Sequence, residues 1–308
     1  MSDKIFSRLI SNQLFPKLTW LRFIGFEFWM VGFTPFFIAY VVSSEKLYDF
    51  NLFYGFLIIA LLTSSTFVLN HICDLDLDRK NPRKEFSLLV RGTLSLRQSW
   101  ILFWVLQIAC IAFSFRFNSD FLICILGLTM ISFVYNVKPF RFKTRPGLDL
   151  VSNGLSLGFL IPLSAWSINQ PIADFPRLYF FSIICYLLAL YCPTMAVDVE
   201  FDRKFGITTL ATKISATRTM QLSWMFTIFG VVALLYSGYY EIFPWNHKLL
   251  FWTGWLLVLE IVVHYNFLPI YSRPSYYTVA KGSIILATFE AVATLLFLII
   301  FLDLLPIG

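Results

Sequence analysis

Long apolar runs dominate this chain and restrict the folds open to it. About nine stretches of near twenty residues follow one another, over residues 21–43, 52–73, 98–117, 119–137, 148–168, 177–198, 217–239, 248–270 and 283–303. A helix of about 20 apolar residues crosses a bilayer and satisfies its own backbone hydrogen bonds there. With 58% hydrophobic and 14% charged residues, the composition lies outside that of soluble domains. We predict an all-α, polytopic membrane protein, a bundle of about nine transmembrane helices.

Residues 1–17 have a different pattern from the rest of the chain. Lys4, Arg8 and Lys17 are spaced among isoleucine, leucine and phenylalanine residues, which indicates a short amphipathic helix on the membrane surface. No cleaved signal peptide is expected, because the first apolar stretch is long enough to remain as a span. We therefore predict an amphipathic tail over residues 1–17 and a single transmembrane domain over residues 18–308.

The basic residues predict the orientation of the bundle. If the N-terminus is cytoplasmic, all but four of the 24 Lys and Arg residues lie on the cytoplasmic side, the exceptions being Lys46, Arg116, Arg177 and Lys248. Cytoplasmic loops carry such an excess. We expect an integral protein of a bacterial inner (cytoplasmic) membrane. The same loops explain the net charge of +6, so the bilayer is an expected partner and nucleic acid is not. The sequence makes no prediction about oligomeric state.

Two groups of polar side chains stand at the cytoplasmic ends of predicted spans. Asn70, Asp74 and Asp78 follow at intervals of four residues, and Asp198 and Asp202 repeat that interval after the sixth span. Residues four apart share one face of a helix, where like charges repel. A divalent cation removes that repulsion, and oxygen ligands suit Mg²⁺, which shares its coordination shell with substrate phosphates. We predict that these five residues bind Mg²⁺.

Basic residues lie on the same side, most densely at Lys138, Arg141, Lys143 and Arg145 after the fourth span. Acids and bases therefore surround a polar, cytoplasm-facing mouth above an apolar bundle. A polyprenyl diphosphate fits this arrangement, since Mg²⁺ and cationic side chains neutralise its head. The implied reaction is ionisation of the allylic C1–O bond, with countercharge stabilising the departing diphosphate. An electron-rich acceptor then attacks the carbocation.

The chain resembles the UbiA-type intramembrane prenyltransferases. The family pattern N-x-x-x-D-x-x-x-D matches residues 70–78, and D-x-x-x-D followed by glycine and Thr-Leu matches residues 198–210. Residues 135–143 are similar to the tyrosine–proline–lysine element after the fourth span of that family. The resemblance runs from about residue 18 to the C-terminus. It implies nine spans and Mg²⁺-dependent transfer of a prenyl group from an isoprenyl diphosphate to a lipophilic acceptor.

This resemblance assigns roles to individual residues. The predicted catalytic residues are Asp74, Asp78, Asp198, Asp202 and Lys143. The predicted diphosphate-binding residues are Asn70, Arg83, Lys143, Arg141, Tyr135 and Arg22. Two features depart from the family pattern: His71 replaces a second acid beside the asparagine, and Asn-Pro-Arg-Lys over residues 81–84 replaces the common Arg-Pro-Leu. The acceptor stays open among an aromatic or quinone precursor, a tetrapyrrole, a glycerol lipid and a carotenoid.

Two alternative functions share part of this pattern. A membrane lipid alcohol phosphotransferase also uses aspartates and Mg²⁺, but its acids form one continuous run, whereas these are split between distant segments. A small-molecule transporter places polar residues near the bilayer midplane, whereas these gather at one face. Ionisable residues deep inside predicted spans have no assigned role, among them Glu27, Glu260, His264 and Glu290. Such residues are candidates for function or for structural pairing.

Overall fold

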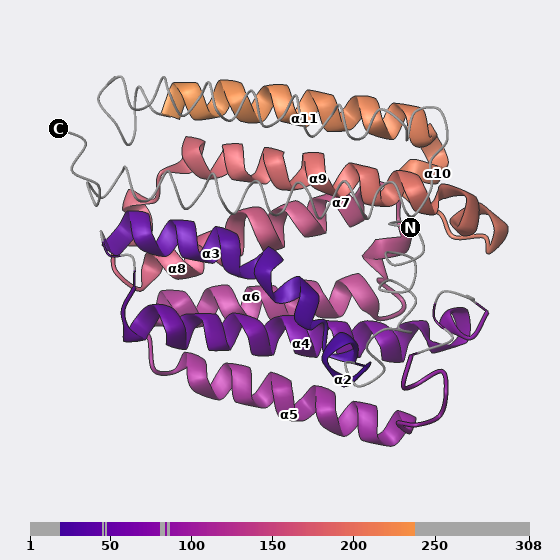
Figure 1. The fold of residues 1–308 in the computed structure, drawn as a ribbon. Coiled ribbons are helices and arrows are strands. Elements are labelled where there is room, and N and C mark those ends of the chain that lie inside the picture. Colours follow the sequence, from indigo (N-terminus) through magenta and orange to yellow (C-terminus); the bar gives the residue numbers. More distant parts are fainter. Residues whose placement is uncertain (1–18, 45, 47, 81–83, 85–86, 238–308) are drawn as a thin grey trace, which may run out of the picture.

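The computed structural model describes residues 19–44, 46, 48–80, 84 and 87–237. Every regular element in these ranges is a helix, and the long helices run roughly along one common direction (Figure 1). The α-helices in these ranges are α2 (Thr19–Phe23), α3 (Trp29–Ser44), α4 (Phe50–Asp78), α5 (Leu96–Ser114), α6 (Ser119–Asn136), α7 (Leu148–Asn153), α8 (Ile161–Ser167), α9 (Arg177–Lys204), α10 (Leu210–Ile214) and α11 (Ala216–Ser237).

The helices confirm the all-α prediction and its membrane character. Among the described residues, five helical segments are long and apolar enough to cross a bilayer: Phe50–Asp78, Leu96–Ser114, Ser119–Asn136, Leu148–Ser167 and Arg177–Ala196. Helices also occupy the positions of the first and seventh predicted spans, as α3 and α11. The predicted spans 248–270 and 283–303 and the predicted tail 1–17 lie outside the described residues.

The first predicted span, 21–43, is wrong as a single helix. The chain breaks at Gly25, which has the left-handed φ of +66°, and a 3₁₀ turn over Phe26–Phe28 (η2) leads into α3. A side chain at this position would also collide with the ring of Phe67, since an added Cβ would lie 2.4 Å from its Cδ2. Glycine tolerates this conformation and this close approach. Helix α2 is therefore a separate short element that packs against α4.

Helix α4 positions the first acidic motif. Its N-terminus is capped by Asp49, whose carboxylate accepts a hydrogen bond from the Leu52 N–H at 2.9 Å and another from the Tyr40 hydroxyl at 2.6 Å. The helix continues to Asp78, five residues beyond the predicted end of the span at residue 73. The motif is therefore presented by helical backbone rather than by a loop, which fixes the relative directions of its side chains.

The fifth predicted span, 148–168, is helical but irregular. Between α7 and α8 the chain forms a π-helix over Gly154–Leu160 (η5), a type of element that often marks functional sites. This segment packs closely on α9, because an added Cβ at Gly158 would lie 2.5 Å from Cγ1 and 2.7 Å from Cα of Ile184. Helix α11 packs along α9 on the other side (Figure 1). Helix α9 is thus held between the η5 segment and α11.

Candidate functional site

The best-defined polar cluster joins α4 to the connection between α6 and α7. The Asp74 carboxylate accepts a hydrogen bond from the Arg141 guanidinium at 2.6 Å and another from Lys143 Nζ at 2.7 Å. All three side chains are largely buried, with the carboxylate 15% exposed. Hydrogen bonds between ionised groups are the strong ones, and burial strengthens them further. The structure therefore brings together three of the residues predicted from the sequence.

Lys143 connects this ion pair to two asparagines. Its ammonium also donates to Oδ1 of Asn70 at 3.3 Å and to Oδ1 of Asn136 at 3.0 Å. Burial lowers the pKa of Lys143 from its ordinary value, while the Asp74 carboxylate opposes that shift and the Arg141 charge adds to it. Three acceptors of fixed position therefore hold a desolvated cation at the end of the bundle.

Arg141 is held in an unusual backbone conformation. Its φ of 40° and ψ of 58° lie in the left-handed region, which non-glycine residues seldom adopt. Its side chain pairs with Asp74, while its buried Nε atom has no hydrogen-bond partner among the described residues. Backbone strain of this kind persists where surrounding contacts demand it and is frequent at functional sites.

Asp78 lies one turn beyond Asp74 and has different surroundings. This carboxylate is buried, and its Oδ2 lies 3.6 Å from Nδ1 of His71. The imidazole in turn stacks on the ring of Phe23, with 4.9 Å between the ring centroids and 10° between the ring planes. His71, the residue that departs from the family pattern, therefore contacts the last residue of the first motif and the short helix α2.

The second acidic motif lies within the last two turns of α9. Asp202 is buried, and its Oδ2 accepts a hydrogen bond from the Thr209 hydroxyl at 3.4 Å. Its backbone carbonyl accepts from the Ile207 N–H at 2.8 Å, which folds the chain back after Gly206. Asp198 lies one turn earlier and is half-buried. Both carboxylates are thus presented by helical backbone, as in the first motif.

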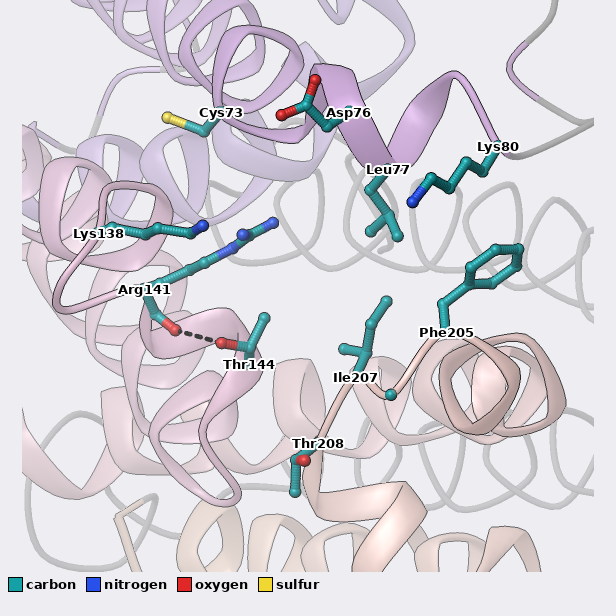
Figure 2. Close-up of a pocket in the computed structure, with 11 residues that line it drawn as sticks. Cys73, Asp76, Leu77, Lys80, Lys138, Arg141, Thr144, Phe205, Ile207 and Thr208 are labelled. Atoms are coloured by element: carbon teal, nitrogen blue, oxygen red, sulfur yellow. Dashed lines mark hydrogen bonds between the residues drawn. The ribbon is translucent and has the colours of Figure 1, made fainter.

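A pocket of about 450 Å³ lies between the segments that bear the two motifs. Figure 2 shows residues from the end of α4 on one side, Arg141 and Thr144 on a second, and Phe205, Ile207 and Thr208 from the α9–α10 connection on a third. Lys80 and Lys138 add two further cations to its lining. Asp76, which does not share the helix face of Asp74 and Asp78, is fully exposed and also lines this pocket. Segments far apart in the sequence therefore line one basic pocket that is open to the outside.

The remaining predicted site residues are Tyr135 and Arg22, together with Arg83, which lies outside the described residues. The Tyr135 hydroxyl lies 3.2 Å from that of Tyr191 and 3.5 Å from Nδ2 of Asn153, on the side of α9 and α7. Arg22 lies in the last turn of α2 and is half-buried. Four residues fall outside the described part of the chain: Arg83, Glu260, His264 and Glu290. The same holds for the side chain of Glu27.

Sequence reasoning missed Asn136, Asp149, Asn153 and Tyr191. In the sequence Asn136 and Asn153 appear only as interruptions of apolar spans. A buried amide needs hydrogen-bond partners, and the partner of Asn136 is Lys143. Asp149 is almost fully buried at the start of α7. The sequence offered one signal for this residue: an acid stands second in an apolar stretch, directly after a segment with four basic residues.

The donor set at this end of the bundle fits Mg²⁺. The acidic motifs offer oxygen donors, and Mg²⁺ commonly takes one or two carboxylates and completes its shell with water and substrate phosphates. Within the described residues no three His, Cys, Asp or Glu side chains form a preformed metal cluster.

Fold and site together define a helical integral membrane protein with a basic pocket at one end of its bundle. The family model described as the UbiA prenyltransferase family matches residues 32–275, and the chain belongs to that family. This confirms the resemblance drawn from the two aspartate motifs.

Individual relatives are more distant. A lycopene elongase/hydratase of Haloarcula japonica is 27% identical over 55% of this chain and 60% of its own length. A probable homogentisate phytyltransferase 2, chloroplastic, of Oryza sativa subsp. japonica is 28% identical over 54% of this chain and 45% of its own. The matches thus span about half of each protein. A UbiA homolog from Archaeoglobus fulgidus, bound to GPP and Mg²⁺, shares the fold with a TM-score of 0.72 at 19% identity, over 92% of this chain and 99% of that one.

Proposed function

We propose that the protein is a Mg²⁺-dependent prenyltransferase that moves a prenyl group from an isoprenyl diphosphate to a lipophilic acceptor. The observation that carries the proposal is the Asp74–Lys143–Arg141 cluster beside a basic pocket walled by both motif-bearing segments. Family membership supports the reaction class. The GPP and Mg²⁺ bound to the Archaeoglobus fulgidus homolog support the donor and the metal.

The site residues divide into two groups. Asn70, Asp74, Asp78, Asp198 and Asp202 would hold Mg²⁺. Lys143 and Arg141 bind the diphosphate, with Arg83, Arg22 and Tyr135 as further contacts. When bound, Mg²⁺ supplies positive charge that stabilises the departing diphosphate. Asp74 pairs with both Lys143 and Arg141, so one carboxylate faces two cations and the remaining positive charge favours an anionic diphosphate.

The reaction breaks the allylic C1–O bond, and the bonding electrons leave with the diphosphate. Lys143 and Arg141 hold donors where that negative charge develops, and preorganised donors of this kind give the largest electrostatic gain. The carbocation that remains forms a new bond with an electron-rich acceptor, which then loses a proton. Apolar helices around the site exclude the water that would otherwise capture the cation.

Membrane orientation belongs to the same proposal. We place the protein in a bacterial inner membrane, with the N-terminus and the pocket facing the cytoplasm, because the nine predicted spans put most Lys and Arg residues on that side. The donor diphosphate is strongly charged and reaches the pocket from the aqueous side. Labelling of a single cysteine introduced at exposed Arg79 tests this orientation: a membrane-impermeant reagent should reach it only in inverted vesicles.

Mass spectrometry of lipids tests the reaction and identifies the acceptor. Membranes from cells that express the protein should contain a lipid heavier by one or more prenyl units than its counterpart in cells without it. The names of the similar proteins make polyenes and phenolic head groups the first classes to inspect. The same cells carrying Asp74→Asn provide the control and should lack the product. The proposal would be contradicted if cells with the wild-type protein, cells without it and cells with Asp74→Asn had the same lipid profile while donor and candidate acceptors were present.

A further inference from the structure

Tyr135 and Tyr191 form a hydroxyl pair of which the proposed reaction uses only one member. The two hydroxyl oxygens lie 3.2 Å apart, with Tyr135 in the last turn of α6 and Tyr191 in α9. Nδ2 of Asn153, at the end of α7, lies 3.5 Å from the Tyr135 oxygen and donates to the backbone carbonyl of Asp149 at 2.8 Å. Three helices therefore meet here through polar groups.

The pair has more hydrogen-bonding capacity than its described neighbours use. Each tyrosine hydroxyl has one proton to donate and can also accept. One of the two protons forms the bond between the hydroxyls, and among the described residues no further group accepts the other. Both side chains are half-buried, so a bound molecule can reach them. The pair therefore has a position for one further polar partner.

Tyr135 lies on the diphosphate side of the pair. The next residue, Asn136, accepts a hydrogen bond from Nζ of Lys143 at 3.0 Å and so belongs to the surroundings of the Asp74 cluster. With Tyr135 donating its proton to the diphosphate, as proposed above, the proton between the two hydroxyls must come from Tyr191. The open position is then the lone pairs of the Tyr191 oxygen, which bind a hydrogen-bond donor such as a hydroxyl.

Tyr191 lies deeper in the bundle than the acidic motif of its own helix. It precedes Asp198 by seven residues of α9, which is about two turns or roughly 10 Å on nearly the same face. Its ring packs on a buried cluster that includes Val199 of α9 and Ala211 of α10, which holds the hydroxyl in place. A group bound at Tyr191 is therefore displaced from the allylic C1 atom, which is bonded directly to the diphosphate.

We propose that Tyr191 binds the hydroxyl of a phenol-type acceptor and thereby selects phenols over hydrocarbon polyenes. The inference rests on the proposed function, since that function places the diphosphate on the Tyr135 side. In a phenol an electron-rich ring carbon attacks, so the hydroxyl is left to bind at a separate position. A glycerol lipid would attack with its hydroxyl oxygen, which must then lie at C1. A polyene has no group for this position and would leave the tyrosine pair incomplete.

The step balances without a further reactant. The ring carbon forms a bond to C1 while the electron pair of the C1–O bond leaves with the diphosphate. The proton lost from that ring carbon passes to the released diphosphate, which is a base. A hydrogen bond from the phenol hydroxyl to the Tyr191 oxygen increases the electron density of the ring and so favours its attack.

Binding of a phenol and of its methyl ether tests the contact without turnover. The protein in lipid nanodiscs, with Mg²⁺ and inorganic pyrophosphate present, is titrated with para-ethylphenol and with para-ethylanisole. The concentration that gives half of the thermal stabilisation is recorded. Wild type should bind the phenol about fivefold more tightly, because the ether cannot donate a hydrogen bond. Tyr191→Phe should bind the two compounds equally.

Tyr40→Phe is the matched control. It also removes a tyrosine hydroxyl with a partner, since Tyr40 donates to Asp49 at 2.6 Å at the opposite end of the bundle. A general loss of stability lowers the Tm of this variant but leaves its preference for the phenol at the wild-type value. The inference is overturned if wild type does not distinguish the phenol from the ether, or if Tyr191→Phe keeps the preference.

Exact masses of the lipids from expressing cells give a second test. The prenylated product should contain oxygen and show the ultraviolet absorption of a phenol. A prenylated hydrocarbon or glycerol lipid overturns the inference but leaves prenyl transfer in place. Cells that form no prenylated lipid contradict the proposed function instead, and the comparison of phenol and ether continues to test Tyr191.

Discussion

Lys143 donates a hydrogen bond from Nζ to Oδ2 of Asp74 at 2.7 Å, although the two residues are 69 positions apart. The contact joins the end of α4 to the loop after α6 and places a cation directly on the central residue of the first acidic motif. Neither residue is free to act alone, since each neutralises the other inside a largely buried cluster. A substrate diphosphate must therefore compete with Asp74 for Lys143, and a metal ion must compete with Lys143 for Asp74.

Replacement of Lys143 by alanine should weaken diphosphate binding more than it alters acceptor choice. A hydrogen bond to a charged group contributes about 2 kcal/mol, roughly a 30-fold change in affinity. The measurement is the apparent KM for an allylic diphosphate together with the pattern of prenylated products. Lys46→Ala serves as the control, because Lys46 is exposed in the α3–α4 connection at the other end of the bundle. An unchanged KM in Lys143→Ala would show that this lysine only stabilises Asp74 and does not bind the diphosphate.

The hydroxyl of Tyr135 can be tested against that of its neighbour Tyr191. Both Tyr135→Phe and Tyr191→Phe remove the 3.2 Å contact between the two hydroxyls. Only Tyr135 is proposed to contact the diphosphate, so only Tyr135→Phe should raise the KM for the donor, by several-fold for a neutral bond of about 1 kcal/mol. Steady-state kinetics of the two variants side by side decide the matter. Equal effects would assign the pair to packing between α6 and α9.

Gly158 should be intolerant of a side chain. The Cβ of Gly158→Ala would lie 2.7 Å from the backbone Cα of Ile184, so η5 and α9 would have to separate. Overpacking of this kind costs about 1–3 kcal/mol. Gly127→Ala in α6 is the matched control, because its Cβ would meet only Leu160 Cδ1, at 3.4 Å. Thermal unfolding in detergent should show a lower Tm for Gly158→Ala alone; similar Tm values for both variants would contradict the close packing.

Much of the helical arrangement could be predicted from hydrophobicity. Apolar stretches gave the positions of the described helices because a membrane span has a characteristic length and polarity. The break at Gly25 and the π-helix over Gly154–Leu160 could not be predicted in this way, since both lie inside apolar runs. They depend on contacts with Phe67 and Ile184, which come from distant parts of the chain.

The candidate site shows the same division. Spacing of four residues identified the two acidic motifs, because helix periodicity is local. The partners of those acids depend on tertiary structure: Asp74 meets Arg141 and Lys143, whereas Asp78 meets His71. Asn136 and Asp149 carried no motif at all, and only their burial beside charged or polar groups reveals them. Periodicity can place a residue on a helix face but cannot say which helix lies opposite.

Mg²⁺-dependent binding of an allylic diphosphate tests the central claim most directly, namely that both acidic motifs serve one diphosphate. Purified wild-type protein should bind a labelled allylic diphosphate in the presence of Mg²⁺ and release it when the metal is chelated. Asp74→Asn and Asp198→Asn, one from each motif, should each weaken this binding about 10- to 100-fold. Asp174→Asn should not, because Asp174 is exposed in the 3₁₀ turn before α9, at the end away from Asp198. Binding equal to wild type in either motif variant would show that the two motifs do not share a substrate.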